Sequence, residues 1–68
     1  MRDVAIREDT IRLGQALKLA GLADSGGEAQ ALIAEGAVTV NGEPETRRGR
    51  QLGKGDVVAV GEEQVRIA

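Results

Sequence analysis

The chain has 68 residues, a formal net charge of −2, and no cysteine, histidine or aromatic residue. These absences exclude disulfides and the commonest general base, and they leave the core to Leu, Ile, Val and Ala. No apolar run approaches the roughly 20 residues that cross a bilayer, and no signal pattern follows Met1, so we expect a cytoplasmic protein without a membrane segment. One domain is expected over residues 1–68.

The first part of the chain predicts a strand and a helix. Residues 2–7 alternate apolar and polar side chains, which is typical of a short strand. A helix is predicted over about residues 10–20, with Thr10 as a capping residue and Gly21 just beyond its end. Its buried stripe consists of residues three and four positions apart, namely Leu13, Ala16, Leu17 and Ala20.

A second helix is predicted to begin at a capping box, Ser25-Gly26-Gly27-Glu28. In this motif the Ser25 hydroxyl accepts a hydrogen bond from the Glu28 amide, and the Glu28 carboxylate accepts one from the Ser25 amide. Gly36 is expected to end the helix, whose buried stripe is Ala29, Leu32 and Ile33. The connection between the two helices is short, so they are expected to be neighbours in space.

Residues 37–44 predict a hairpin. Asn41-Gly42 follows an alternating run, and a type I′ turn needs positive φ at both of its central positions. Pro44 cannot donate a backbone hydrogen bond, so the returning strand is expected to be short or at a sheet edge.

The rest of the chain predicts a loop and two further strands. Gly49 and the segment Gly53-Lys54-Gly55-Asp56 indicate a loop, and strands are expected at residues 57–60 and 64–67. Val65 and Ile67 are expected to face inward. Two helices followed by several short strands indicate an α+β fold.

Positive charge is concentrated in residues 45–54. Four cations against Glu45 give this segment a net charge of +3 (4 − 1), whereas residues 1–44 and 55–68 carry −3 and −2; the four are Arg47, Arg48, Arg50 and Lys54. Arginine binds phosphates and stacks on unpaired bases, although a solvated loop is the usual interpretation of a charge run alone. The concentration of the cations in an otherwise acidic chain and the backbone amides at the second helix start favour a nucleic-acid partner. This hypothesis requires the cations to converge on one patch, and guanidinium groups locked onto neighbouring carboxylates would count against it.

Other chemistry finds little support in the sequence. The acids are scattered, no hydroxyl has a histidine partner, and residues 49–55 lack the spacing of a P-loop. We therefore expect no catalytic residue, no metal, no cofactor and no small-molecule substrate. The amides of Gly26 and Gly27 at a helix start could receive an anion, although simple capping is the alternative. Without aromatic residues, a base-stacking platform is excluded.

Together these segments resemble the S-four RNA-binding domain family, especially its small stand-alone bacterial branch, over about residues 11–60. The resemblance rests on Ile11-Arg12-Leu13, Leu17-Lys18-Leu19, Ser25-Gly26-Gly27-Glu28-Ala29, Leu32-Ile33, Gly36, Val38-Thr39-Val40-Asn41-Gly42-Glu43, Arg47-Arg48 and Gly55-Asp56-Val57-Val58. It implies a two-helix αL motif packed on a small, mainly antiparallel sheet. It also implies a non-catalytic module that binds structured RNA, of the ribosomal or transfer RNA type, with the ribosome or a ribosomal subunit as the larger partner.

The resemblance further implies which residues contact RNA. Arg12 matches the arginine that opens the family's first helix, and Ser25 and Gln30 match positions of the second helix that face RNA. With the basic loop and the hairpin, the expected set is Arg12, Lys18, Ser25, Gly26, Gly27, Gln30, Asn41, Arg47, Arg48, Arg50 and Lys54. Many members have basic residues where this chain has Gly26 and Gln30, so more of the binding is expected from the loop.

A protein-interaction adaptor is the alternative function. The hairpin after residues 38–40 could offer its edge to a partner chain, and the arginine-rich loop could meet an acidic surface. A monomer is expected in either case.

Overall fold

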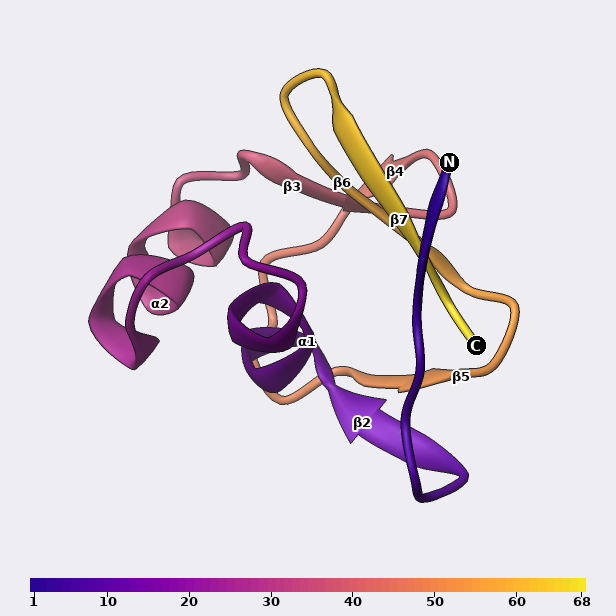
Figure 1. Cartoon of the computed structure of the whole chain (residues 1–68). Coiled ribbons are helices and arrows are strands. Elements are labelled where there is room, and N and C mark those ends of the chain that lie inside the picture. The colour runs from indigo at the N-terminus through magenta and orange to yellow at the C-terminus, as the bar shows by residue number, and fades with distance from the viewer.

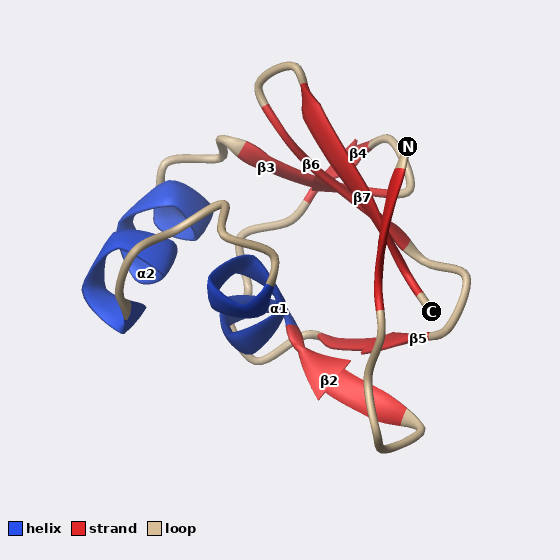
Figure 2. Ribbon diagram, in the orientation of Figure 1, coloured by secondary structure: helices blue, strands red, loops and turns tan.

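The computed structural model describes residues 1–68, and it contains two helices and seven short strands (Figure 1). In chain order they are β1 (Arg2–Val4), β2 (Thr10–Arg12), α1 (Leu13–Leu19), α2 (Gly26–Ala34), β3 (Val38–Val40), β4 (Glu43–Pro44), β5 (Gln51–Gly53), β6 (Val57–Val60) and β7 (Glu63–Ile67). The two helices lie together on one side, and the main sheet lies on the other (Figure 2). The predicted α+β fold is therefore confirmed.

The main sheet has five strands in the order β1-β7-β6-β3-β4. Its first pairing, β1 with β7, is parallel, and the other three are antiparallel, so the sheet is mainly antiparallel as expected. Val58 lies opposite Val40 on one side and Val65 on the other, which aligns three buried valines across the sheet. Val65 and Ile67 face inward as predicted.

The start of the first helix differs from the prediction. Residues Thr10–Arg12 form β2, which pairs with β5, and α1 begins only at Leu13. Arg12 is the extended N-cap residue and makes no capping hydrogen bond through its side chain, so Thr10 does not cap the helix. The amides of Leu13 and Gly14 donate instead to the carbonyls of Arg50 (2.8 Å) and Arg48 (3.3 Å). The loop before β5 thus caps α1.

The same pairing corrects the predicted loop over residues 49–56. Its central residues, Gln51–Gly53, form β5, with Leu52 opposite Ile11 and fully buried. The pairing joins segments about forty residues apart, so local turn signals in the glycine-rich sequence could not show it.

Both helices end as the glycines predict. At the end of α1, Gly21 has φ of 74°, its amide donates to the Lys18 carbonyl (3.1 Å), and the Leu22 amide donates to the Leu17 carbonyl (2.9 Å). This is a Schellman motif, and it requires a left-handed residue that glycine adopts without strain. The same motif recurs at the end of α2, where Gly36 has φ of 77°.

The predicted hairpin is also confirmed. Asn41 and Gly42 both have positive φ, 53° and 87°, as a type I′ turn requires. The returning strand β4 has only two residues and lies at the sheet edge, in agreement with the presence of Pro44.

One apolar core lies between the helices and the strands. It consists of Val4, Leu13, Ala16, Leu17, Ala20, Ala23, Ala29, Ile33, Val38, Val40, Leu52, Val58, Val65 and Ile67. The predicted stripes are buried, except that Leu32 is only partly so. Neither helix is long and apolar enough to cross a membrane. A single charged residue, Glu45, is buried as well.

Candidate nucleic-acid interface

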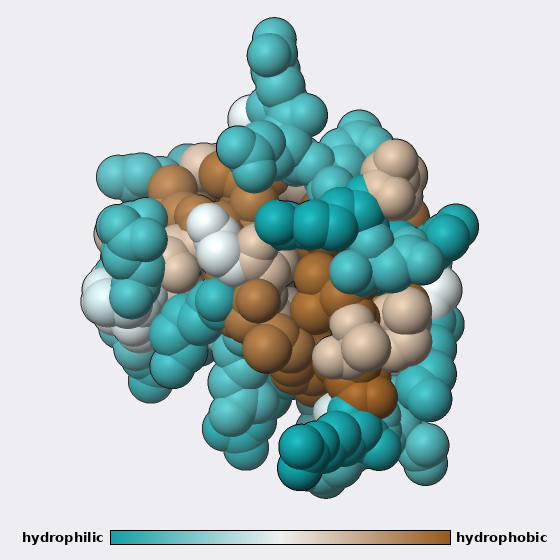
Figure 3. All heavy atoms as spheres, viewed as in Figure 1, coloured by the Kyte–Doolittle hydropathy of each residue, from teal (hydrophilic) through white to brown (hydrophobic).

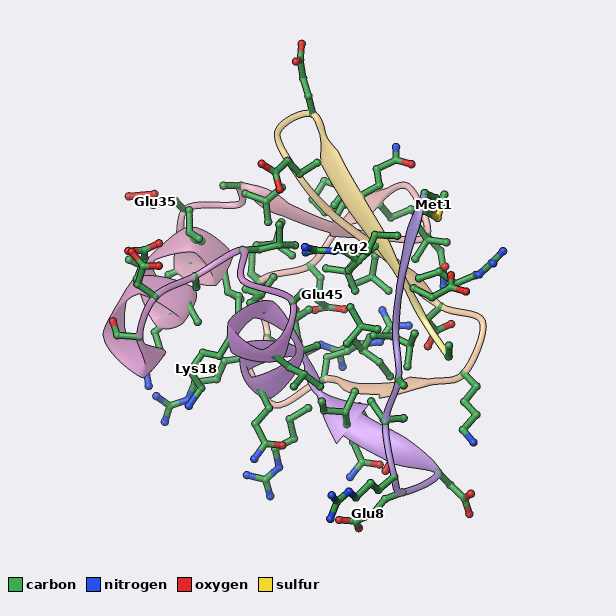
Figure 4. The ribbon with its side chains drawn as sticks, viewed as in Figure 1. Met1, Arg2, Glu8, Lys18, Glu35 and Glu45 are labelled. Atoms are coloured by element: carbon green, nitrogen blue, oxygen red, sulfur yellow. The ribbon has the colours of Figure 1, made fainter.

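The most unusual side chain in the basic segment is the buried carboxylate of Glu45, which is 8% exposed. Glu45 directly follows β4, and its amide donates to the Val38 carbonyl (3.0 Å). Figure 4 shows Glu45 in the middle of the molecule, between α1 and the sheet. Oε2 accepts hydrogen bonds from the amide (3.1 Å) and Nε (3.0 Å) of Arg47, while Oε1 accepts from Arg47 Nη2 (3.2 Å) and Arg50 Nη1 (2.9 Å).

These hydrogen bonds keep Glu45 ionised. The side chains of Arg47 and then Arg50, followed by the Arg47 amide, lower the pKa of Glu45 from 4.5 to about 2, against the opposing effect of burial. The same pair raises the pKa of Arg47. The Glu45 carboxylate and the Arg47 guanidinium therefore stay charged in neutral and mildly acidic solution.

The four cations of the basic segment are consequently not equivalent. Arg47 and Arg50 form salt bridges with Glu45, which is the arrangement that counts against a single free cationic patch. Arg48 and Lys54 have no salt-bridge partner. Arg47 can still donate hydrogen bonds to another partner, because its side chain is 75% exposed and three of its five N–H groups remain open.

Arg48 lies close to the start of α1, and Lys18 lies close to the first turn of α2. Its carbonyl accepts the Gly14 amide, and Gly14 lies one turn before Lys18 on the same face of α1. Lys18 Nζ is 4.0 Å from the position that a Cβ on Gly26 would occupy. Figure 4 shows Lys18 extending from α1 toward α2. Arg48, Lys18 and the start of α2 therefore follow one another along α1, and we call this set the basic line.

The start of α2 leaves backbone donors open beside Lys18. Ser25 Oγ accepts the Glu28 amide at 3.1 Å, which confirms half of the predicted capping box, but the Ser25 amide makes no return bond to Glu28. The amides of Gly26 and Gly27 have no hydrogen-bond partner. They point out of a helix N-terminus, where partial positive charge accumulates.

Asn41 has a structural function in the free protein. Its Nδ2 donates to Asp56 Oδ1 (3.1 Å), its Oδ1 accepts the Val57 amide (2.9 Å), and its own amide donates to the Val57 carbonyl (2.7 Å). Asp56 in turn accepts the Gly53 amide (2.8 Å), and this bond, followed by the one from Asn41, lowers the pKa of Asp56. The hairpin is thereby fixed to the start of β6.

The hairpin and the basic loop enclose a polar groove of about 540 Å³. Val40, Asn41, Glu43, Pro44, Glu45, Arg47 and Arg50 line it, and we call it the hairpin groove. Three of the predicted RNA-binding residues, Asn41, Arg47 and Arg50, are thus brought together here. The basic line holds a different subset: Lys18, Ser25, Gly26, Gly27 and Arg48.

Three other predicted residues lie outside both groups. Lys54 follows β5 at the end that pairs with Thr10, whereas Arg12 pairs with Gln51 at the opposite end, beside α1. Arg12 is exposed near the start of α1, and Gln30 is exposed on α2. Lys54 is therefore separated from the arginines that precede it in the sequence.

An apolar groove of about 320 Å³ lies on another face. Its lining residues are Ala5, Ile6, Arg7, Glu8, Thr10, Ile11, Gln15 and Leu19, and Leu19 is 57% exposed. Figure 3 shows apolar side chains gathered near the middle of the face it displays, with hydrophilic side chains around them. Sequence reasoning missed this groove, because Leu19 lies outside the predicted buried stripe of the first helix and no local pattern places residues 5–8 beside it.

Sequence reasoning also missed two contacts through which charged side chains hold the fold together. Glu45 was counted among scattered acids, although its position two residues before Arg47 and five before Arg50 was a usable signal. Arg2 donates through Nη2 to the Ala20 carbonyl at the end of α1, where a cation is favoured. No local pattern indicates that contact.

Comparison with known proteins identifies the family of the chain. A family model described as the S4 domain matches residues 4–68. The chain belongs to the S4 domain family. The resemblance seen in the sequence is therefore confirmed, and the match reaches beyond residues 11–60 to include Val4, the last residue of β1, and all of β7.

One protein similar in sequence and one solved structure can be compared with the chain. One, a "probable ribosome maturation protein RlbA" of Bacillus subtilis, is 49% identical over 57 residues, which is 84% of this chain and 80% of the relative. The crystal structure of 30S ribosomal protein S4e from Thermoplasma acidophilum superposes with a TM-score of 0.67 at 25% identity. That match covers 88% of this S4 domain but only 32% of the ribosomal protein.

Proposed function

We propose that this S4 domain is a non-catalytic module that binds structured RNA, of the ribosomal or transfer RNA type, in association with the ribosome. The basic line supports the proposal most directly, because Lys18 and Arg48 have no salt-bridge partner and Lys18 lies next to the open amides of Gly26 and Gly27. The names of the two similar proteins, one for ribosome maturation and one from the small ribosomal subunit, agree with it.

Each part of the proposed surface has a separate task. Arg48 and Lys18 contact phosphates, with Arg12 beside them at the start of α1, and the amides of Gly26 and Gly27 receive one further phosphate. Ser25 and Gln30 border that position on α2. Asn41, Arg47 and Arg50 meet the RNA at the hairpin groove, and Lys54 makes an outlying contact from the far end of β5.

The helices supply shape rather than a sequence code. α1 and α2 pack on each other and on the sheet, and both end in fixed Schellman turns. A rigid surface of this kind suits folded RNA, which proteins recognise largely by shape and by backbone contacts. Catalysis has no part in the proposal, because the chain has no histidine or cysteine.

Salt dependence of RNA binding tests the phosphate contacts. The logarithm of the association constant for ribosomal RNA should fall with the logarithm of salt concentration at a slope near −3 if about four cations neutralise phosphates. Arg48→Ala should make that slope shallower by about 0.7 to 0.9. Arg7→Ala removes the same charge away from the basic line and should leave the slope unchanged. A wild-type slope near zero would exclude the mechanism.

The adaptor function remains the competing hypothesis. β4 is a two-residue edge that contains Pro44, so it offers few backbone donors to a partner strand. A simple observation separates the two functions, because the chain has no Trp or Tyr and absorbs little near 280 nm. RNA retained on purification at low salt would dominate the spectrum at 260 nm, whereas a preparation free of nucleic acid under those conditions would favour the adaptor.

A further inference from the structure

The hairpin groove differs in charge from the basic line. The formal charges of its two acidic and two basic residues, Glu43, Glu45, Arg47 and Arg50, sum to zero (2 − 2). A groove without net charge has little attraction for a phosphate, although it is rich in hydrogen-bonding groups. Its chemistry suits an uncharged polar partner better, and a nucleobase is the part of RNA that fits this description.

Arg47 presents its guanidinium group to this groove in a fixed orientation. The edge formed by Nε and Nη2 is taken by the two oxygens of Glu45, at 3.0 and 3.2 Å, and the Arg47 backbone amide is bonded to the same carboxylate. The remaining end, with both N–H groups of Nη1 and one of Nη2, stays open on a side chain that is 75% exposed. Two parallel donors therefore face outward.

The surroundings of Arg47 are equally fixed. Arg50 shares Glu45 from the other side, and Asn41 ties the opposite wall of the groove to β6. Pro44 adds an apolar ring to the lining. Binding a phosphate does not require a guanidinium to be held along one edge, since a phosphate accepts hydrogen bonds from many directions. Recognition of a base edge does require it, because there the acceptor positions carry the information.

We propose that Arg47, positioned by Glu45, reads the edge of one unpaired RNA base in the hairpin groove. The inference rests on the proposed RNA-binding function. The open end of Arg47 offers two donors and no acceptor, so it matches edges with two adjacent acceptors. Guanine has O6 and N7 on its Hoogsteen edge, and cytosine has O2 and N3 on its Watson–Crick edge. Adenine and uracil alternate donors and acceptors, and the groove discriminates against them.

Selection from a hairpin RNA with a fixed stem and a loop of eight randomised nucleotides tests the proposal. The wild-type domain should enrich guanine or cytosine at one loop position by about 5- to 150-fold, the range that one bidentate contact supplies. Arg47→Lys keeps the charge but loses the planar fork, so the enrichment should disappear while the salt dependence of binding stays the same. The matched control, Arg48→Ala, should keep the base enrichment and make the salt dependence of binding shallower.

Glu45→Gln separates positioning from simple electrostatics, since it removes a negative charge beside the RNA. If charge alone matters, binding to the whole RNA pool tightens and base enrichment is unchanged. If Glu45 positions Arg47, the enrichment is lost even though the groove has become more positive. Arg47→Lys changes only an exposed side chain, so it decides the matter if Glu45→Gln does not fold.

The results that would overturn this inference differ from those that would overturn the proposed function. Failure of the wild-type domain to bind any hairpin in the pool contradicts the proposed function. Binding without base enrichment contradicts only the inference about Arg47. Equal weakening of all loop sequences by Arg47→Lys, with a shallower salt dependence, would show that Arg47 contacts a phosphate and not a base.

Discussion

The two cationic regions of this S4 domain are built in opposite ways. Arg47 and Arg50 share a buried carboxylate, and their orientation is fixed by hydrogen bonds of 2.9 to 3.2 Å. Lys18 and Arg48 have no acidic partner, and Lys18 lies beside unpaired backbone amides at the start of α2. Arg47 and Arg50 have a fixed orientation, but Glu45 offsets part of their charge. Lys18 and Arg48 keep their full charge, and no salt bridge fixes their orientation. A single run of arginines in the sequence thus contains two different kinds of residue.

Alanine substitutions should give the largest difference between the two regions, because one set should change RNA binding and the other should change stability. The double variant Lys18→Ala/Arg48→Ala should make the salt dependence of RNA binding shallower by about 1.4 to 1.8, because two phosphate contacts are lost. Its free energy of unfolding should stay within about 0.5 kcal/mol of the wild type, since both side chains are exposed and unpaired. Urea denaturation followed by circular dichroism provides the stability measurement.

Arg50→Ala should lower stability and leave the salt dependence of RNA binding nearly unchanged, which is the opposite of the result for the double variant. It leaves the buried Glu45 with one partner fewer, so the unfolding midpoint should fall, whereas the salt dependence of RNA binding should change little. An Arg50→Ala protein as stable as the wild type would mean that the Glu45 pairing does not hold the loop in place.

Acid should remove the stability that the Glu45 ion pairs provide, and it should not affect Lys18 and Arg48, which have no acidic partner. The pKa of Glu45 is lowered from 4.5 to about 2 in the folded protein, so its contribution to stability is complete above about pH 4.5 and is lost as the pH falls toward 2. Glu45→Gln lacks this contribution. The difference in unfolding midpoint between wild type and Glu45→Gln should therefore narrow on acidification through this range, which a urea titration at several pH values measures. Asp56, whose pKa is also lowered, is present in both proteins and cancels in the difference.

The smallest expected effect on stability comes from Ser25→Asp, which tests the open amides. Aspartate caps a helix about as well as serine, so the unfolding midpoint should hardly change. The added negative charge lies beside Gly26 and Gly27 and should weaken RNA binding. Ser25→Asn is the matched control, because it caps without adding charge and should bind like the wild type. Equal affinities for the Asp and Asn variants would remove the amides of α2 from the interface.

Local signals in the sequence predicted much of this fold. The apolar stripe through Leu13 and Leu17, the glycines that end both helices, and Asn41-Gly42 each depend on residues within one or two turns of the chain. The pairing of β2 with β5 depends on residues about forty positions apart, and it moved the start of α1 from residue 10 to Leu13.

The candidate site was predictable in composition but not in arrangement. The sequence indicated which cations to consider, because charge density is a local property. Pairing of Arg47 and Arg50 with Glu45 depends on how β4 presents Glu45 to the core, and the proximity of Lys18 to Gly26 depends on how α1 packs on α2. Tertiary packing decides both, so neither could be read from the spacing of the charges.

Amide chemical-shift mapping during titration with ribosomal RNA tests the central claim most directly. The largest shifts should occur at Gly26, Gly27, Lys18 and Arg48, and they should diminish as salt is added. Shifts confined to the apolar groove around Ile6 and Leu19, with the α2 amides unchanged, would contradict the account.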